Sequence, residues 1–475
     1  MSDNNEKLGI KEKIAYGLGD VSNGLAVSSI SLWLLIYLTD VAGLSPQVAA
    51  LAIVIGRVWD AVTDPVMGWI TDHTKSRWGK RRPYLLFGAI PYALAYFSLW
   101  VVPGFEKEVF SFAYVTVALV VFNTCLTVVF VPYTSLTAAI TNDYNERTSI
   151  TGYRMFCSQS SFLIGAAIPS ALVMFFSSVD GSALLRDIGA YDLFGSWAGT
   201  ARTGYFIMAI IFALIMIASI WTTFLGCRER DTEEEEPDPN QTPLTYASSI
   251  LDELQGNRPF RLSVLILLLT NCATAFIAVN LAYYIQYVLK ITSHQTNIVS
   301  FLFVVAIIMV PIWVSVAKKF GKVETYRVTM LCLVAVLCML PFVKEGDVTF
   351  TYIVAGMAGL FYSAALLLPW AIVPDVVEFD QLKTGKRREG LFYGGTTFSY
   401  KLATAIAVFA SGSILEWAGY IANQDQTTTV VATIQNIIGP LPALILVFSV
   451  YLSLYYPLTA EKHKKIVEEI AAKKL

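Results

Sequence analysis

The chain has 475 residues, of which 55% are hydrophobic and only 15% are charged, and its mean hydropathy is +0.58. This composition excludes an ordinary soluble protein and indicates a polytopic membrane protein. The net charge of −2 provides no basic field that would attract nucleic acid. The Cys residues show no CxxC spacing, so we expect reduced thiols with no disulfide and no metal.

Twelve apolar runs are each long enough to cross a hydrocarbon core of about 30 Å. They lie at 14–39, 47–70, 84–102, 109–140, 150–178, 203–226, 261–289, 297–317, 326–343, 348–374, 391–418 and 430–457. The predicted fold class is therefore an all-α membrane protein with twelve transmembrane helices.

Lys and Arg gather in alternate loops, whereas the intervening loops 40–46 and 419–429 contain none. By the positive-inside rule, both termini are predicted to be cytoplasmic, in a plasma (inner) membrane. The polar N-terminus has no cleavable-signal pattern, so we expect the first spanning helix to direct insertion.

A long polar insertion at 227–260 divides the helices six and six. It opens with an acidic run typical of solvated linkers, and 244–254 is predicted to be a short amphipathic surface helix. We expect helix bundles at 1–226 and 261–457 and a cytoplasmic tail at 458–475. Two such halves are typical of transporters built from parallel repeats, with the substrate bound between them near mid-membrane.

The second apolar run contains two carboxylates, Asp60 and Asp64, with Thr63 beside them. A spacing of four places both carboxylates on one helix face, where they repel each other, and each costs about 3 kcal/mol at mid-membrane. A cation among these oxygens removes the penalty, which predicts a Na⁺ or H⁺ site. The alternative is that a Lys or Arg of a neighbouring helix neutralises the pair.

Two of the basic residues within the apolar runs are candidates for a functional role, Lys401 and Arg154. Lys401 is too deep to reach the surface, so we expect it to contact substrate or serve as a counter-ion to the cation site, with a structural ion pair as the alternative. Arg154, nearer the start of its helix, is open to either a substrate contact or a lipid head-group contact.

Other polar groups are weaker candidates. Thr127 either lends an oxygen to the cation or bonds back within its own helix. In the first helix, Asp20 either caps the helix or lines the cavity, and Asn23 beside it is a candidate substrate contact. Trp370 either stacks on a sugar or packs in the protein interior.

Charged residues follow the fourth and tenth helices at corresponding positions of the two halves. Arg147 paired with Asp375, with Glu378 nearby, is a hypothetical inner gate; solvated loop charges are the alternative. We find no HExxH, P-loop or plausible GxSxG motif, so we expect neither an enzyme nor ATP-driven transport, and an ion gradient remains as the energy source.

Several motifs resemble known families. GWITDHTKSRWGKRRP (68–83), which contains Asp72 and Arg77, resembles the helix 2–3 signature of the major facilitator superfamily. YGLG (16–19), WDAVTDP (59–65), VPY (131–133) and PDVVE (374–378) are similar to the glycoside–pentoside–hexuronide:cation symporters, the group of melibiose permease.

The resemblance implies two six-helix bundles, alternating access, a gating role for the 68–83 signature, and Na⁺, Li⁺ or H⁺ as the coupling ion. The implied cation ligands are Asp60, Thr63, Asp64 and Thr127, and the implied substrate contacts are Arg154, Thr396, Thr397 and Lys401.

The chain departs from the galactoside pattern. Gly24 and Phe130 stand where melibiose permease has two acidic residues, and Leu366 stands where it has a Trp. GRVWD (56–60), NERTSITGYR (145–154) and LPWAIVPD (368–375) are similar to the sodium-dependent lysophosphatidylcholine symporters of the same wider family. An apolar Phe130 suits a less hydroxylated or partly lipidic substrate.

We therefore expect a symporter for a sugar, glycoside or related solute, acting as a monomer in the bilayer with a monovalent cation and no other cofactor. The alternatives are a sodium-coupled lysophospholipid symporter and a non-transporting sensor with a transporter fold.

Overall fold

The computed structural model describes residues 8–141, 144–178, 201–230, 256–385, 388–458 and 460–473, and within these ranges every regular element is helical. The chain divides into two compact units, Met1–Gln241 and Thr242–Leu475. The acidic run and the amphipathic helix predicted within 227–260 lie outside the described residues.

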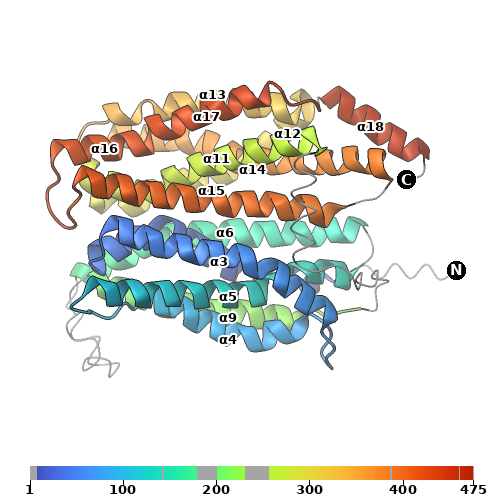
Figure 1. Cartoon of the computed structure of the whole chain (residues 1–475), viewed down its shortest axis with the longest axis horizontal. Coiled ribbons are helices and arrows are strands. Elements are labelled where there is room, and N and C mark those ends of the chain that lie inside the picture. Colours follow the sequence, from blue (N-terminus) through green and yellow to red (C-terminus); the bar gives the residue numbers. More distant parts are fainter. Residues whose placement is uncertain are drawn as a thin grey trace. The chain divides into compact units, whose positions relative to one another are not determined.

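The described helices of unit 1 form the following segments in chain order (Figure 1). The first is interrupted and consists of α1 (Ile10–Gly19), α2 (Val21–Ser29) and the π-helical turns η1 (Ile30–Leu34) and η2 (Tyr37–Val41); the others are α3 (Pro46–His73), α4 (Arg82–Leu99), α5 (Glu108–Ile140), α6 (Tyr144–Ser178) and α9 (Ala201–Gly226). In this unit α2 packs on α6, α3 packs on α5, and α4 packs on both α5 and α9.

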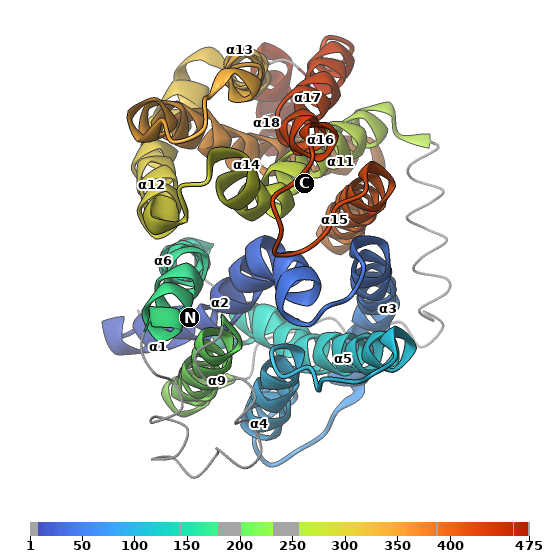
Figure 2. The ribbon, with the colours of Figure 1, turned by 90° about the vertical axis from the view of Figure 1, so that its left-hand side faces the viewer.

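Unit 2 repeats this arrangement in the same chain order (Figure 2). Its elements are α11 (Arg258–Tyr283) continued by η4 (Tyr284–Leu289), η5 (Thr292–His294), α12 (Gln295–Phe320), α13 (Lys322–Leu337), η6 (Leu340–Phe342), α14 (Val348–Thr384), α15 (Glu389–Ala418), α16 (Thr428–Ile438), α17 (Pro440–Ser453) and α18 (Ala460–Lys473). Here α11 packs on α15, α12 packs on α14, and α13 packs on both α14 and α17.

Matching contacts extend the likeness to single side chains. The first helix of each unit ends in a π-helical turn that begins with a buried Tyr. The Tyr37 hydroxyl donates to the carbonyl of Trp100 at 2.6 Å, and the Tyr284 hydroxyl donates to the carbonyl of Leu340 at 2.7 Å. Each bond joins the first helix of a unit to the end of its third.

Nine helices in the described ranges are long and apolar enough to span a membrane. Of an apolar stretch of 18 residues within each helix, 72% is buried in Arg258–Leu289 but only 28% in Thr292–Phe320. The first helix therefore lies inside unit 2 and the second on its outside. The remaining predicted spans are the interrupted first helix, α3 with its acidic pair, and the short α4. The predicted all-α membrane fold is confirmed.

Two predicted helices are broken. The first bends at Asp20, between α1 and α2. The last divides at Gly439, because Pro440 lacks an N–H and restricts the residue before it. A Cβ on Gly439 would lie 2.7 Å from the carbonyl oxygen of Leu337, so a side chain there would collide with α13.

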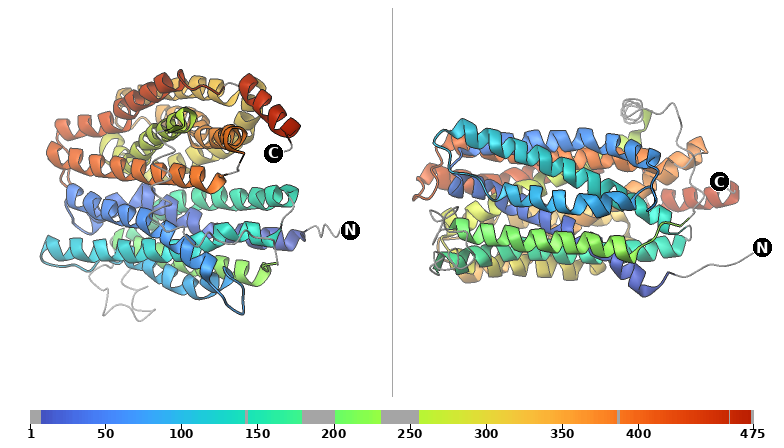
Figure 3. Two further views of the ribbon diagram at one scale, coloured as in Figure 1. Left: turned by 45° about the vertical axis from the view of Figure 1, so that its right-hand side comes forward. Right: turned by 90° about the horizontal axis from the view of Figure 1, so that it is seen from below.

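Two elements extend beyond the predicted boundaries. The tenth helix, α14, runs on to Thr384 instead of ending at 374. The predicted tail contains α18, which buries Ile466, packs against α14 and turns away from the direction of α17 (Figure 3).

Candidate functional site

The two carboxylates of α3 meet Thr127 of α5. The Thr127 hydroxyl oxygen lies 3.1 Å from Asp60 Oδ1, 3.0 Å from Asp64 Oδ1 and 3.2 Å from Thr63 Oγ1. Asp60 and Thr127 are each only 2% exposed. All four predicted cation ligands therefore lie together inside unit 1, which the sequence could not establish for a residue more than 60 positions away.

Gly56 brings these two helices close, one turn before Asp60. A Cβ at this position would lie 2.9 Å from Leu119 Cβ and 3.0 Å from Asn123 Nδ2. The Asn123 amide donates to the Leu119 carbonyl of its own helix at 2.8 Å, so this hydrogen bond stays within α5. The glycine is thus the local reason that Thr127 reaches both carboxylates.

The single proton of the Thr127 hydroxyl limits the hydrogen bonds that it can make to the two carboxylates. A hydroxyl has one proton and donates one hydrogen bond at a time. When Thr127 donates to Asp60, its oxygen faces the Asp64 carboxylate through lone pairs, and the reverse holds when it donates to Asp64. Thr63 does not relieve this contact, because its hydroxyl donates to the Asp60 carbonyl at 3.1 Å. A proton on one carboxyl, or a cation among these oxygens, removes the opposed contact.

The donor set fits a hard monovalent cation. Two carboxylates and two hydroxyls supply only oxygen ligands, which hard cations prefer to nitrogen or sulfur. The same set also fits a shared proton, because two carboxylates this close resist simultaneous ionisation.

A second polar cluster joins the first helix of unit 1 to α6. Arg154 Nε lies 3.4 Å from Asp20 Oδ2, and the Asn23 amide donates to Asp20 Oδ1 at 3.1 Å. The bend at Asp20 turns this carboxylate toward α6. Sequence reasoning named all three residues but did not pair Asp20 with Arg154; their opposite charges within apolar helices were the available signal.

Small residues let α2 and α6 approach at this cluster. A Cβ on Gly24 would lie only 1.9 Å from Ser161 Oγ and 2.6 Å from the Ser158 carbonyl oxygen. An acidic side chain at position 24 therefore has no room. Phe130 is half-buried against Tyr133, with ring centroids 5.5 Å apart. Neither position supplies the acids of the galactoside pattern.

The predicted substrate contacts of unit 2 lie on α14 and α15. Trp370 of α14 and Tyr400 of α15 have ring centroids 6.2 Å apart, and Lys401 is half-buried. The Thr396 hydroxyl is buried and donates to the Phe392 carbonyl of its own helix at 2.7 Å, so its proton is already engaged. Thr397 is half-buried. Its role as a substrate contact, which the resemblance implies, stays a prediction.

The gating residues are only partly described. Asp375 forms an ion pair with Lys322 at the start of α13 and lies 3.4 Å from His463 of α18. His463 also pairs with Glu378. Asp375 thus has partners within its own unit that the sequence did not reveal. The side chain of Arg147 lies outside the described residues, so its pairing with Asp375 stays a prediction.

The loop between α3 and α4 is bound by Glu229, which lies in the segment 227–260 that was predicted to be a linker. The Glu229 carboxylate accepts hydrogen bonds from the backbone N–H groups of Lys80, Arg81 and Arg82, at 2.7, 2.8 and 2.9 Å. Anions are stabilised at a helix N-terminus in this way. The Arg77 guanidinium lies over the Trp78 ring at 4.0 Å, and the side chain of Asp72 lies outside the described residues.

Comparisons with known proteins agree on the class of this chain. Residues 15–460 match the family described as MFS/sugar transport protein. The chain is 30% identical to an uncharacterised symporter of Synechocystis sp., over 98% of each chain. It is 30% identical to the sphingosine-1-phosphate transporter of Xenopus tropicalis (97% of this chain, 90% of that one). It is 27% identical to the sodium-dependent lysophosphatidylcholine symporter 1 of Mus musculus (97% and 88%).

Among solved structures, the fold resembles that of a bacterial homologue of the human lysosomal transporter Spinster, with a TM-score of 0.66. The sequence identity is 11%, and the alignment covers 96% of this chain and 97% of the other. The family match over residues 15–460 does not separate the melibiose permease group from the rest of the family. The membership of this chain in that group therefore stays a prediction. The chain is thus an integral multi-pass membrane protein that belongs to the MFS/sugar transport protein family.

Proposed function

We propose that the protein is a cation-coupled symporter, a transporter without catalytic activity that works as a monomer. The observation that carries the proposal is the contact of one hydroxyl, that of Thr127, with both Asp60 and Asp64. Two carboxylates in contact with one hydroxyl repel each other, and a cation or a proton among their oxygens would lessen that repulsion. Na⁺, Li⁺ and H⁺ all fit such a site, and no further cofactor is needed.

Coupling follows from linkage between the cation and the substrate. The cation removes the repulsion between the carboxylates of α3 and so stabilises the form of unit 1 in which α3 and α5 are held together by Thr127. If that form binds the substrate better, the substrate must tighten cation binding by the same factor. A gradient of the cation then drives accumulation of the substrate.

For the substrate we propose a glycoside or a related small solute. In unit 1, Arg154 with Asp20 and Asn23 offers charged and amide groups of the kind that bind hydroxyls. In unit 2, Trp370 and Lys401 offer an aromatic face and a cation. The groups of unit 1 by themselves suit the polar part of a ligand, and Trp370 of unit 2 suits an apolar face.

A lysophospholipid is the second candidate, because Gly24 and Phe130 leave no acid where the galactoside pattern places one. Relatives named for lysophosphatidylcholine and sphingosine-1-phosphate cover nearly the whole chain, which supports this class. For such a substrate, Arg154 or Lys401 would pair with the phosphate.

Uptake into proteoliposomes tests both the coupling and the substrate. Radiolabelled methyl glycosides, a hexuronide and lysophosphatidylcholine are each offered with an inward gradient of Na⁺, Li⁺ or H⁺ as the only energy source. We expect concentrative uptake of one class with at least one cation. Gradient-independent binding without uptake of any class would instead favour the sensor.

Two variants separate coupling from folding. Asp64→Asn removes one carboxylate charge from the site and is expected to abolish gradient-driven accumulation. Asp425→Asn makes the same chemical change at a side chain that is 92% exposed and is expected to leave uptake intact. Concentrative uptake by Asp64→Asn at the wild-type level would contradict the proposed cation site.

A further inference from the structure

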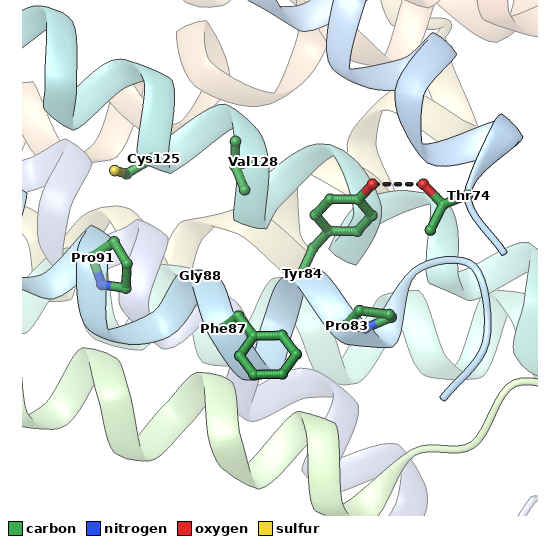
Figure 4. A pocket seen from close by; sticks show the side chains of 8 residues that line it. All are labelled: Thr74, Pro83, Tyr84, Phe87, Gly88, Pro91, Cys125 and Val128. Atoms are coloured by element: carbon green, nitrogen blue, oxygen red, sulfur yellow. Dashed lines mark hydrogen bonds between the residues drawn. The ribbon is translucent and has the colours of Figure 1, made fainter. Parts of the chain in front are cut away.

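A groove on the outside of unit 1 has no role in the transport scheme. It lies between α4, α5 and the end of α3 and has a volume of about 370 Å³ (Figure 4). Its lining is mainly apolar and consists of Thr74, Pro83, Tyr84, Phe87, Gly88, Pro91, Cys125 and Val128. The helices beside it expose large apolar side chains, among them Phe87 and Leu94, each 62% exposed. This face is therefore one that meets the acyl chains of the bilayer.

The groove has one polar end. The hydroxyls of Thr74 and Tyr84 are 2.6 Å apart at the end where α4 begins, whereas Pro91 and Cys125 lie toward the other end (Figure 4). From Pro83 to Pro91, α4 rises about 12 Å. A ligand along this groove would meet hydroxyls first and only apolar groups and one thiol beyond them.

Positive charge lies at the same end. The segment between Thr74 and Pro83 contains five Lys or Arg residues and no acidic residue. Trp78 of this segment packs against Phe87 of the groove wall, with ring centroids 5.6 Å apart, and the Arg77 guanidinium covers the Trp78 ring. Lys75 directly follows Thr74 and is exposed. Arg77 thus contacts Trp78, and Trp78 contacts Phe87 of the groove. A cation, a Trp and an apolar surface follow one another in this way at a membrane–water interface.

The Glu229 carboxylate offsets only one of these five positive charges. Glu229 is directed at the backbone N–H groups of Lys80, Arg81 and Arg82, where it compensates the start of α4. Two of those basic side chains are engaged elsewhere: Arg81 donates to Ser135 Oγ at 2.9 Å, and Arg82 donates to the Phe224 carbonyl at 2.7 Å. Lys75 and Arg77, both exposed, are the basic residues that we place at the mouth of the groove.

We propose that this groove binds an anionic phospholipid of the leaflet that faces the 74–83 segment. One acyl chain lies along Phe87, Gly88 and Pro91, and the phosphate lies against Lys75 and Arg77. The acyl chain gives little selectivity, since bilayer lipid is equally apolar, and the charges give most of it. Each Lys or Arg near a membrane surface favours an anionic lipid by about fivefold.

Photo-crosslinking tests the proposal on the full chain in phosphatidylcholine vesicles. Trace phosphatidylglycerol or phosphatidylcholine carries a diazirine in one acyl chain, and the modified peptides are mapped by mass spectrometry. We expect the phosphatidylglycerol probe to label residues 83–91 and 125–128 at least fivefold more than the phosphatidylcholine probe does. The equally apolar face around Leu214 of α9, which is 62% exposed, should show no such preference.

Two variants test the two ends of the groove. Lys75→Gln should lower phosphatidylglycerol labelling about fivefold without changing phosphatidylcholine labelling. Cys125→Phe fills the apolar end and should lower labelling by both probes several-fold, while the matched Cys125→Ser should not. Equal labelling by the two probes, or labelling spread evenly over both faces, would overturn the proposal. Stronger labelling by a diazirine lysophosphatidylcholine would also overturn it and assign the groove to a substrate lipid.

Discussion

Replacing Thr127 with Val tests the cation site most directly. Val keeps the branched shape but removes the hydroxyl that contacts Asp60, Asp64 and Thr63. Both carboxylates stay in place, so α3 keeps its charges and loses only the group that joins them to α5. We expect the folded protein to remain and its cation affinity to fall.

The size of the effect follows from the hydrogen count. Thr127 donates one bond at a time, so the variant loses one hydrogen bond to a charged group, which contributes about 1.5–3 kcal/mol. At about 1.4 kcal/mol per factor of ten, cation binding should weaken roughly 10- to 150-fold. Counting a full bond to each carboxylate would double the energy and is excluded by the single proton.

Thermal unfolding in detergent measures the change without a known substrate. At a cation concentration 100 times Kd, binding stabilises a protein by about 2.7 kcal/mol. A variant with roughly 100-fold weaker binding would keep only about 0.4 kcal/mol at that concentration. Titrations with NaCl and LiCl against choline chloride, and with pH, identify the ion whose half-saturation point moves.

The matched control is Thr134→Val, two turns farther along α5. The Thr134 hydroxyl bonds only backbone carbonyls of its own helix, at 3.0 Å to Phe130 and 3.1 Å to Val131. Its removal should leave every titration unchanged. If Thr127→Val titrates like the wild type with Na⁺, Li⁺ and H⁺ alike, the reasoning about the shared proton is wrong.

Three further outcomes are expected. Lys401→Ala should impair uptake far more than Lys290→Ala, because Lys290 is an exposed residue 3.4 Å from its acidic partners in loops outside the spans; equal, mild effects on uptake kinetics would reduce Lys401 to a structural role. Gly24→Asp should lower the free energy of unfolding by at least about 1–3 kcal/mol through overpacking and should not create galactoside uptake, and an unchanged melting temperature would contradict the close approach of α2 to α6. Burial raises the pKa of the Cys227 thiol to about 12, so its thiolate is scarce below that pH. Maleimide at pH 8 should therefore modify Cys227 much more slowly in the folded protein than in the same chain unfolded in sodium dodecyl sulfate, and similar rates by mass spectrometry would show that Cys227 is accessible.

The breaks in the first and last helices show where the hydropathy pattern ceased to be informative. Both apolar runs are long enough to span, so length and composition predict one continuous helix for each. The division at Gly439 depends on two neighbouring prolines and on the carbonyl of Leu337, and only the proline part was visible in the chain. At the break between α1 and α2, the Asp20 carboxylate pairs with Arg154 of α6, a partner that the apolar pattern of the first run does not indicate.

Glu229, which binds the α3–α4 loop, lies in the region that the sequence predicts to be a linker. Glu229 lies between Arg228 and Arg230, directly before the acidic run that begins at Asp231, and nothing in its neighbours indicates three backbone donors. Those donors exist only because α4 begins at Arg82 beside the end of α9. The partners of Asp375 were hidden for the same reason, since Lys322 and His463 come from separate helices of unit 2.

Periodicity and spacing within one helix were enough to predict the membrane class and the acidic turn of α3, because hydropathy and the spacing of four residues are local properties of the chain. The oxygens that complete that turn could not be assigned from spacing, because Thr127 belongs to another helix and its register depends on the close crossing at Gly56. The missing room at Gly24, the pairing of Asp20 with Arg154 and the charged mouth of the outer groove were likewise decided by packing. The contacts of Gly24 and of Asp20 join helices that are distant in the chain, and the apolar patterns of those helices permit many registers, of which the folded structure keeps one.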